Sequence, residues 1–221
     1  MRYGDILPAG FVVPSSAFWL KNDLTVEKNP FKDLPTPERA TVMDCGAFIG
    51  TFTAACLEQR AWHVTCYEAA PKNAGILRMN MARYGTHVTL IEKALTATDA
   101  QIVTLNMSGF SGTNSILPPT TTKSKSIEVP ALNFRRELLR VRPQVLKLDV
   151  EGAEYDLLES LEVGDLASVE SLFIEFHPIE DREELIDDIS QFLVHEGFTI
   201  INARRCTFTA VRKPEGFLEF E

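Results

Sequence analysis

Acidic residues end five apolar stretches that have the length of β-strands. The five acids are Asp44, Glu68, Glu92, Asp149 and Glu175. In an open parallel sheet, ligands bind in the crevice beyond the carboxyl ends of the strands, so these carboxylates would converge on one edge. Such an edge suits a ligand with cationic or hydroxyl-rich groups. The alternative is that each acid stabilises the N-terminus of the following helix, and for a single acid both explanations stay open.

A turn with two glycines follows the first of these stretches and opens the next helix. Residues 44–50 read DCGAFIG, and Gly46 and Gly50 allow a tight turn and a close approach of a ligand to the backbone. Glu68 lies 24 residues after Asp44, a position from which an acid accepts the hydroxyls of a ribose. The turn lacks the dinucleotide pattern GxGxxG, and the chain has no Gly-Lys-Ser or Gly-Lys-Thr phosphate loop. Because an acid before the glycines would repel a pyrophosphate, we expect S-adenosylmethionine, with its amino and sulfonium groups, as the cofactor.

Three charged residues alternate along the fourth apolar stretch. Lys147, Asp149 and Glu151 share one face of that strand, where a buried lysine needs an acid beside it. His177 follows Glu175 by two residues, and an imidazole at the carboxyl end of a strand is a candidate general base. We therefore expect Asp149 and Glu151 to face the methyl group and its acceptor, with His177 as the base.

Two other interpretations of this group stay open. Its charges could form a buried network that fixes the strand ends, with His177 only orienting a carboxylate. Asp149, Glu151, Glu175 and His177 could also gather a magnesium or manganese ion, which oxygen ligands with one imidazole suit. A metal is possible but not favoured, because Lys147 can neutralise the cluster, and we predict no metal ligand.

The elements that must position these residues alternate between strands and helices. We expect strands over 40–44, 62–68, 87–92, 144–149 and 169–175. Helices are expected over 51–60 and 71–84, after the fourth strand, and over 181–196, where apolar residues recur at helical spacing. Strands over 198–202 and 206–211, joined by a short turn, would form an antiparallel pair. This order predicts an α/β fold, a doubly wound, mostly parallel seven-stranded sheet with a terminal antiparallel strand pair.

Length and charge restrict the domain organisation and the partners. The 221 residues fit one domain, so we expect residues 1–35 to be an irregular lead-in that packs on a domain formed by residues 36–221. The net charge of −9 disfavours nucleic acid and anionic membranes as partners. No stretch has the length of a membrane span, and the first residues lack the pattern of a secretory signal, so we expect a cytoplasmic protein.

A polar stretch interrupts the alternation of strands and helices. Residues 108–127 contain 14 Ser, Thr, Gly, Pro or Asn in 20 positions, too few apolar groups to build a core. The stretch is either a flexible connection between strands at 101–106 and 128–130 or a lid on the cofactor side. As a lid, it would bring Asn114 and Ser115 near the cofactor, while Phe18 and Trp19 of the lead-in would help to line the acceptor pocket.

Several segments resemble the FkbM-type methyltransferases. These segments are DCGAFIG at 44–50, YEAAPKN at 67–73, KAL at 93–95, LKLDVEGAE at 146–154 and IEFH at 174–177. The resemblance spans about residues 40–205, and KLDVEGAE is its most specific part. Cys45 departs from the hydrophobic residue usual in the family, and Ala69 stands where proline is frequent. Neither departure undermines cofactor binding.

The resemblance implies a class I, S-adenosylmethionine-dependent methyltransferase of Rossmann-like fold, whose relatives methylate hydroxyl oxygens of sugars or polyketides. It implies that the cofactor is held by Asp44, Gly46, Ala47, Phe48, Ile49, Gly50, Glu68, Ala69, Lys93, Ala94 and Asp149. We expect in-line methyl transfer to a hydroxyl of a sugar, glycan or other small metabolite, with His177, Glu151 and Asp149 as catalytic residues.

Two other functions stay in view. A dinucleotide-dependent oxidoreductase is disfavoured by the missing GxGxxG pattern, and a non-catalytic nucleoside-binding module is disfavoured by the acidic edge. The acceptor and the oligomeric state are not readable from these residues. The chain has no Asn/Asp-Pro-Pro-aromatic motif of the kind that handles a flipped base, so we expect a small-molecule or glycan acceptor and no nucleic acid.

Overall fold

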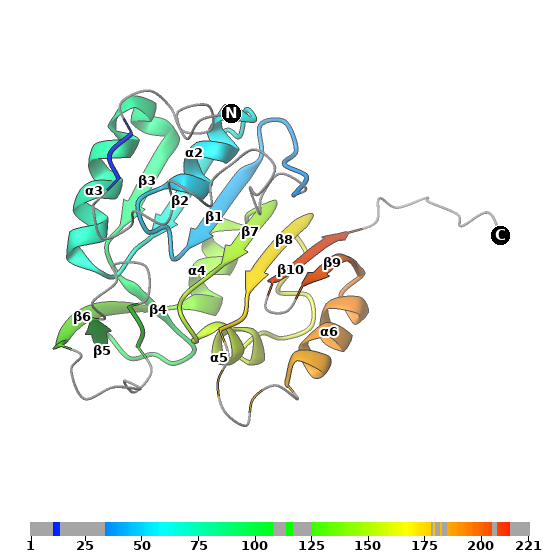
Figure 1. Cartoon of the computed structure of the whole chain (residues 1–221). Helices are drawn as coiled ribbons and strands as arrows, with labels where there is room; N and C mark the ends of the chain where they lie inside the picture. The colour runs from blue at the N-terminus through cyan, green and yellow to red at the C-terminus, as the bar shows by residue number, and fades with distance from the viewer. Residues whose placement is uncertain are drawn as a thin grey trace.

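The computed structural model describes residues 11–13, 34–107, 114–116, 125–177, 179, 182, 185–204 and 207–212. Within them, seven strands form one sheet in the order β3-β2-β1-β7-β8-β10-β9, and three form a smaller sheet in the order β4-β6-β5 (Figure 1). In the main sheet β3, β2, β1, β7 and β8 are parallel, and β10 is antiparallel to both β8 and β9. The predicted α/β fold, with its mostly parallel seven-stranded sheet and terminal antiparallel pair, is confirmed.

The elements have the following bounds. The main sheet contains β1 (Thr41–Cys45), β2 (His63–Tyr67), β3 (Val88–Ile91), β7 (Val145–Leu148), β8 (Ser171–Glu175), β9 (Phe198–Arg204) and β10 (Thr207–Arg212). The small sheet contains β4 (Ala94–Thr96), β5 (Ile102–Met107) and β6 (Lys125–Asn133). The helices are α2 (Thr51–Glu58), α3 (Pro71–Met81), the 3₁₀-helix η3 (Ala82–His87), α4 (Phe134–Val141), α5 (Glu154–Glu159) and α6 (Leu185–His195).

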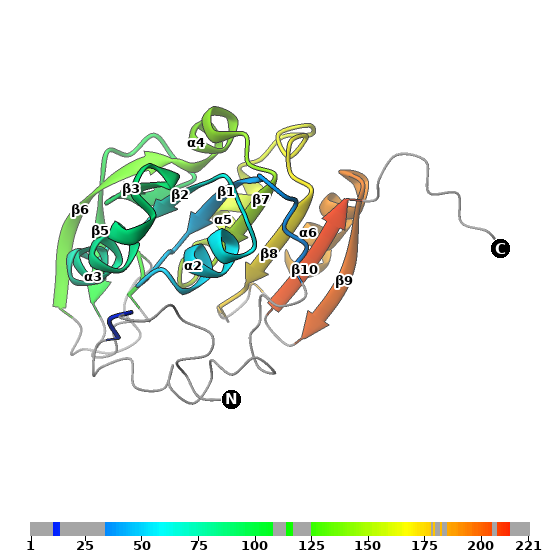
Figure 2. The same ribbon diagram turned by 90° about the horizontal axis from the view of Figure 1, so that it is seen from above.

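Two apolar layers cover the main sheet, one on each face. α2 and α3 pack on one face, and α4, α5 and α6 pack on the other (Figures 1 and 2). Because side chains alternate along a strand, Asp44 and Lys147 share the α2 side with Val42 and Phe173, while Met43 and Leu146 face the other layer. Asp44 of β1 stands directly beside Lys147 of β7 in the register of the two strands. The alternation therefore buries two opposite charges next to each other under α2.

The small sheet and α4 are absent from the sequence-based prediction. We predicted only single strands at 101–106 and 128–130, whereas β6 starts at Lys125, inside the polar stretch 108–127, and pairs with both β4 and β5. β4 has only three residues, too few to show a period. Asn133 begins α4 by accepting a hydrogen bond from the backbone N–H of Arg136. The small sheet lies beside the carboxyl ends of β1 and β2, as Figure 1 shows, and so it flanks the site.

Little of the lead-in is described. The backbone N–H of Val12 donates to the side chain of Asn80 on α3 at 2.7 Å, and Asn80 donates back to the carbonyl of Val12 at 3.0 Å. Residues 11–13 therefore lie against α3. Phe18, Trp19 and most of the polar stretch lie outside the described residues. No helix in the described part of the chain combines the length and the apolar character needed to cross a membrane.

Candidate functional site

The glycine turn after β1 brings the ends of three strands together. Gly46 has φ +79°, and its backbone N–H and that of Ala47 donate to the carbonyl of Tyr67 at the end of β2. A Cβ atom at Gly46 would lie 1.7 Å from the carbonyl oxygen of Asp149 at the end of β7, so only glycine fits there. The close contact at Gly46 holds this turn against the strand that carries Lys147 and Asp149.

Glu68 connects this turn to β2. One carboxylate oxygen accepts the backbone N–H of Phe48 and the other accepts that of Ala70, both at 2.8 Å. Burial raises the pKa of Glu68 to about 7, although these two backbone hydrogen bonds act to lower it. Each carboxylate oxygen has two lone pairs, so the group can still accept hydroxyl donors from the cavity that it lines.

Lys147 sits among acidic groups below the turn. Its Nζ lies 3.0 Å from Asp149 Oδ2, 3.5 Å from Asp44 Oδ1 and 3.0 Å from the carbonyl of Gly46. Burial lowers the pKa of Lys147, but the negative charges of Asp149 and Asp44 raise it by more, so the amino group stays protonated. Burial also raises the pKa of Asp44, whose Oδ1 has no hydrogen-bond partner among the residues that the structure describes. For Asp44, Lys147 and Asp149, the charge network that we kept as an alternative is present.

Glu151 and His177 form a pair across the carboxyl ends of β7 and β8. His177 Nε2 lies 3.2 Å from Glu151 Oε2, and Nδ1 lies 3.0 Å from Glu154 Oε1. Burial lowers the pKa of His177, but the hydrogen bond to Glu154 and the charges of Glu154, Glu151 and Asp149 together raise it to about 9. Burial raises the pKa of Glu151 to about 8, against the lowering by His177. Each group therefore acts on the other, because Glu151 raises the pKa of His177 and His177 lowers that of Glu151.

A single cavity joins the two halves of the site. Among the predicted residues, its lining includes Gly46, Phe48, Glu68, Ala69, Lys93, Ala94, Asn114, Asp149, Glu151 and His177. Asp44, Ala47 and Ile49 are buried behind it, and Gly50 meets Leu77 and Met81 of α3. Ser115 donates to the carbonyl of Glu151, which places residues 114–116 beside the cavity. Lid closure and each residue's role stay predictions.

The expectation that all five strand-end acids meet at one edge is wrong for Glu92, and Asp44 lies beneath that edge without lining the cavity. Glu92 forms an ion pair with Arg78 of α3 on the surface and does not line the cavity. Asp44 is fully buried under α2, where Thr53 donates to it at 2.6 Å. The acids that do line the cavity are Glu68, Asp149, Glu175 and, beyond the strand end, Glu151.

Several lining residues were not predicted. They are Tyr67, Ala70, Asn73, Leu95, Leu105, Ile116, Val150 and Ala153. Leu105 lies in a strand whose pairing was not predicted and Ile116 in the loop that follows it, so no local pattern could assign them to the cavity. Glu154 also escaped notice, although an acid in the first turn of a predicted helix was the available signal.

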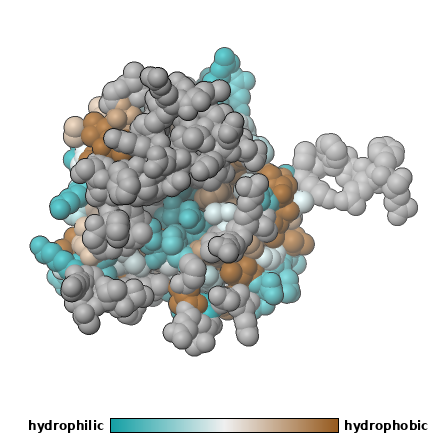
Figure 3. All heavy atoms as spheres, viewed as in Figure 1, coloured by the Kyte–Doolittle hydropathy of each residue, from teal (hydrophilic) through white to brown (hydrophobic). Residues whose placement is uncertain are grey.

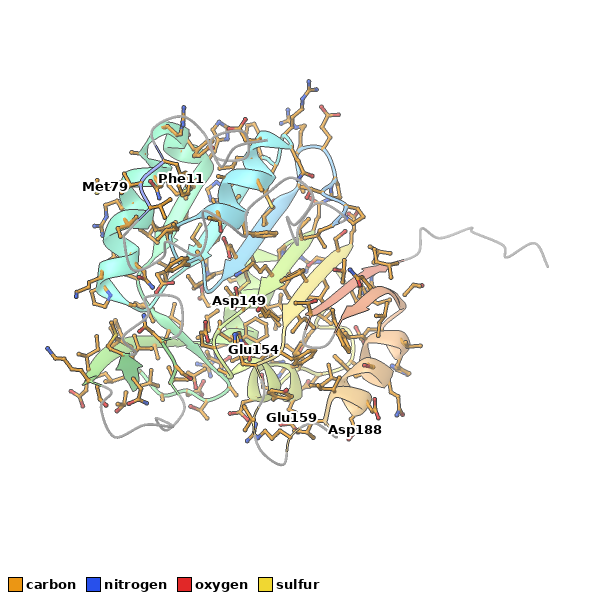
Figure 4. The ribbon with its side chains drawn as sticks, in the orientation of Figure 1. Phe11, Met79, Asp149, Glu154, Glu159 and Asp188 are labelled. Carbon is orange, nitrogen blue, oxygen red and sulfur yellow. The ribbon has the colours of Figure 1, made fainter. Side chains whose placement is uncertain are left out.

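The space-filling view shows hydrophilic residues gathered in the middle of the face that carries the carboxyl ends of the strands (Figure 3). Asp149 and Glu154 are labelled in the same region of Figure 4. Asp149, Glu151 and His177 each offer one ligand atom, and these atoms lie within 4.8 Å of one another, which a divalent ion would tolerate. Because Lys147 already pairs with Asp149, we still predict that none of these residues is a metal ligand.

Residues 44–206 match the family described as "Methyltransferase FkbM domain". No curated protein sequence matches the chain.

Solved structures with a similar arrangement of the chain include fibrillarin of Methanococcus jannaschii, a pre-rRNA processing protein, with 15% identity over 82% of this chain and 71% of that one (TM-score 0.47). A ribosomal protein L11 methylase from Lactobacillus delbrueckii is 16% identical over 80% and 72% (TM-score 0.42). A Podospora anserina methyltransferase with SAH bound is 10% identical over 79% and 72% (TM-score 0.44).

Proposed function

The chain belongs to the FkbM methyltransferase family and is an S-adenosylmethionine-dependent methyltransferase, and we propose that it methylates a hydroxyl group of a sugar, glycan or other small metabolite. The observation that carries this proposal is the Glu151–His177 pair in the cavity that Glu68 also lines. An alcohol is a poor nucleophile while it keeps its proton, so its methylation gains from a nearby proton acceptor.

The residues at the β1 and β2 ends fit the cofactor. Glu68 offers the acceptor atoms that two ribose hydroxyls require, and the glycine turn lets a ligand approach the backbone. Asp149 supplies negative charge near a cationic amino or sulfonium group. When bound, S-adenosylmethionine supplies a methyl group that its sulfonium has already activated. Lys93 and Ala94, with Asn114 and Ser115, are proposed to complete the cofactor side.

The residues at the β7 and β8 ends are proposed to handle the acceptor. Glu151 holds the acceptor hydroxyl by a hydrogen bond and takes its proton as the new oxygen–carbon bond forms, while His177 Nε2–H donates to the Glu151 carboxylate. Since the Nδ1 and Nε2 atoms of His177 both face carboxylates, Glu151 is the member of the pair that is free to meet the acceptor. The negative charge of Asp149 stabilises the positively charged sulfonium at the reacting centre. No step in this scheme requires a metal ion.

The wider assignments are part of the same proposal. Residues 36–221 are taken as the methyltransferase domain, with residues 1–35 packed on it, and the protein as cytoplasmic. The net charge of −9 and the acidic lining favour a small polyhydroxyl acceptor over a nucleic acid or a membrane surface.

Two measurements test the function. Calorimetry with S-adenosylmethionine, S-adenosylhomocysteine and NAD in parallel should show binding of the first two only. Methyl transfer from S-adenosylmethionine with a tritiated methyl group should then be screened against monosaccharides, oligosaccharides, polar metabolites, RNA and an unfolded protein. Incorporation as an alkali-stable methyl ether in a hydroxyl compound is expected. Incorporation into RNA or protein alone would overturn the proposal.

Replacing Glu68 by glutamine should weaken S-adenosylmethionine binding by about 10- to 100-fold, because one backbone N–H would then face an amide N–H and the ribose would lose a charged acceptor. At saturating cofactor, kcat should change by less than about twofold, since this interaction is the same before and during methyl transfer. Calorimetric Kd values and initial rates measure the two effects. Glu92→Gln is the matched control, because it makes the same change at a strand-end acid outside the cavity.

A further inference from the structure

Glu154 is a fully buried carboxylate just behind the cavity. It is the first residue of α5 (Figure 4), and it is not among the residues that line the cavity. A buried carboxylate is costly unless hydrogen bonds compensate for the lost water. Here three polar hydrogens converge on its two oxygens, and all three come from segments that carry the proposed catalytic pair.

Two of these hydrogens belong to the turn that carries Glu151. The backbone N–H of Val150 donates to Glu154 Oε1 and that of Gly152 donates to Oε2, each at 2.8 Å. The turn therefore wraps around the carboxylate, with Glu151 between the two donors. Glu151 itself adopts φ +58°, a left-handed conformation that is unfavourable for a residue with a side chain. The two hydrogen bonds to Glu154 hold that conformation.

The third hydrogen belongs to His177. Nδ1 lies 3.0 Å from Glu154 Oε1, which makes Nδ1–H the donor and fixes the plane of the ring. With the ring so fixed, Nε2 is directed at Glu151 Oε2 at 3.2 Å. The same carboxylate thus holds the backbone of Glu151 from one side and the ring of His177 from the other.

We propose that Glu154 is a positioning residue for methyl transfer, which sets the distance and the angle between Glu151 and His177 without touching the acceptor. This inference rests on the proton-accepting role proposed above for that pair. Proton transfer demands hydrogen-bond geometry, and groups that only orient catalytic side chains commonly contribute about 10- to 100-fold to activity. A residue that only stabilises the start of α5 would contribute to folding but not to kcat.

A kinetic double-mutant cycle separates the two roles. Glu154→Gln should lower kcat by about 10- to 100-fold, because an amide cannot accept all three hydrogen bonds, while the Kd of S-adenosylmethionine stays within about threefold. In the His177→Ala background the same substitution should lower kcat by less than about threefold, since one of the two positioned groups is gone. Asp156→Asn, on the same helix but paired with Arg182 at the surface, is the matched control and should retain the wild-type kcat.

The assay uses tritiated-methyl S-adenosylmethionine and the acceptor with the highest incorporation in the screen. If Glu154→Gln does not fold, Glu154→Asp takes its place, because it retracts the charge by one methylene and should show the same dependence on His177. A kcat within twofold of wild type, or an equal loss of kcat with and without His177, overturns the proposal. Failure of the proposed function has a different signature, in which Glu151→Gln and His177→Ala also leave kcat unchanged.

A measurement without acceptor completes the test. Glu154, Glu151, Asp149 and Glu175 are the charged groups that act on His177 from α5, the turn after β7, and β8. In the complex with S-adenosylhomocysteine, an NMR titration should give the His177 ring a pKa near 9 in wild type and a lower value in Glu154→Gln, but an unchanged value in Asp156→Asn. An unchanged pKa in Glu154→Gln would show that the two side chains do not interact and would overturn the proposal.

Discussion

Glu151→Gln should lower kcat for methyl transfer by about 100-fold or more, while the Kd of S-adenosylmethionine stays within about threefold. The amide has nearly the same shape as the carboxylate, but it cannot take the proton of the acceptor hydroxyl. It also removes the charge that His177 Nε2 faces at 3.2 Å. His177→Ala should likewise reduce kcat far more than cofactor affinity. Equal losses of kcat and cofactor affinity in these variants would contradict the assignment of both residues to proton transfer.

Glu159→Gln is the control for this substitution, because Glu159 is exposed at the end of α5, does not line the cavity and should leave both parameters unchanged. The wild-type pH profile gives an independent check. Since burial raises the pKa of Glu151 to about 8, the proton-accepting form is scarce below that pH. We therefore expect kcat to rise with pH through about pH 8 in the wild type, and this rise to be lost in Glu151→Gln. A flat wild-type profile would argue against Glu151 as the acceptor of the proton.

Lys147→Met should reduce the free energy of unfolding by about 3–5 kcal/mol, the largest stability effect that we predict for one side chain. The substitution keeps the length of the aliphatic chain but removes the cation between Asp44 and Asp149. Asp44 would then be a fully buried carboxylate, and Thr53 would be the only side-chain donor to it within the described residues. Urea unfolding midpoints at constant slope measure the loss. Lys72→Met, an exposed position on α3, should change stability by less than about 0.5 kcal/mol.

The pH dependence of this loss has a definite sign. Burial raises the pKa of Asp44 above its ordinary value of 3.8, so the folded protein binds that proton more tightly than the unfolded chain. Such a group lowers stability as the pH rises, and Lys147 opposes the effect in the wild type. The deficit of Lys147→Met should therefore be largest at neutral pH and should shrink as the pH falls and Asp44 takes up its proton. A deficit that does not depend on pH would show that lost packing, rather than an unpaired charge, causes it.

How much of the site could be predicted depends on how local each residue's environment is. Glu68 and Asp149 were predictable, because strand alternation and the parallel order of the strands fix where a terminal acid lies. Glu92 obeys the same pattern but lies within reach of Arg78 on α3, and a sequence pattern does not reveal such a competing partner. Glu154 depends on a turn that folds back over four residues and on His177, which is 23 residues further along the chain.

The fold was predictable to a similar depth. The strands of the main sheet carry apolar runs between clear breaks, so their positions along the chain could be predicted from the sequence. The small sheet depends on β6 pairing with two strands from an earlier part of the chain, one of which has three residues. Long-range pairing of this kind leaves almost no local signal, although it supplies Ala94, Leu95 and Leu105 to the cavity wall.

The position of β10 between β8 and β9 has a consequence for biosynthesis. β9 is synthesised before β10, but in the sheet it pairs with β10 and not with β8. Neither β8 nor β9 can therefore complete its hydrogen bonds until residues 207–212 have left the ribosome. During that interval the growing chain presents an open edge on β8, the strand that carries Glu175 towards the cavity. Open strand edges invite pairing with other chains. Translation that stops before residue 207 would therefore yield an aggregation-prone protein.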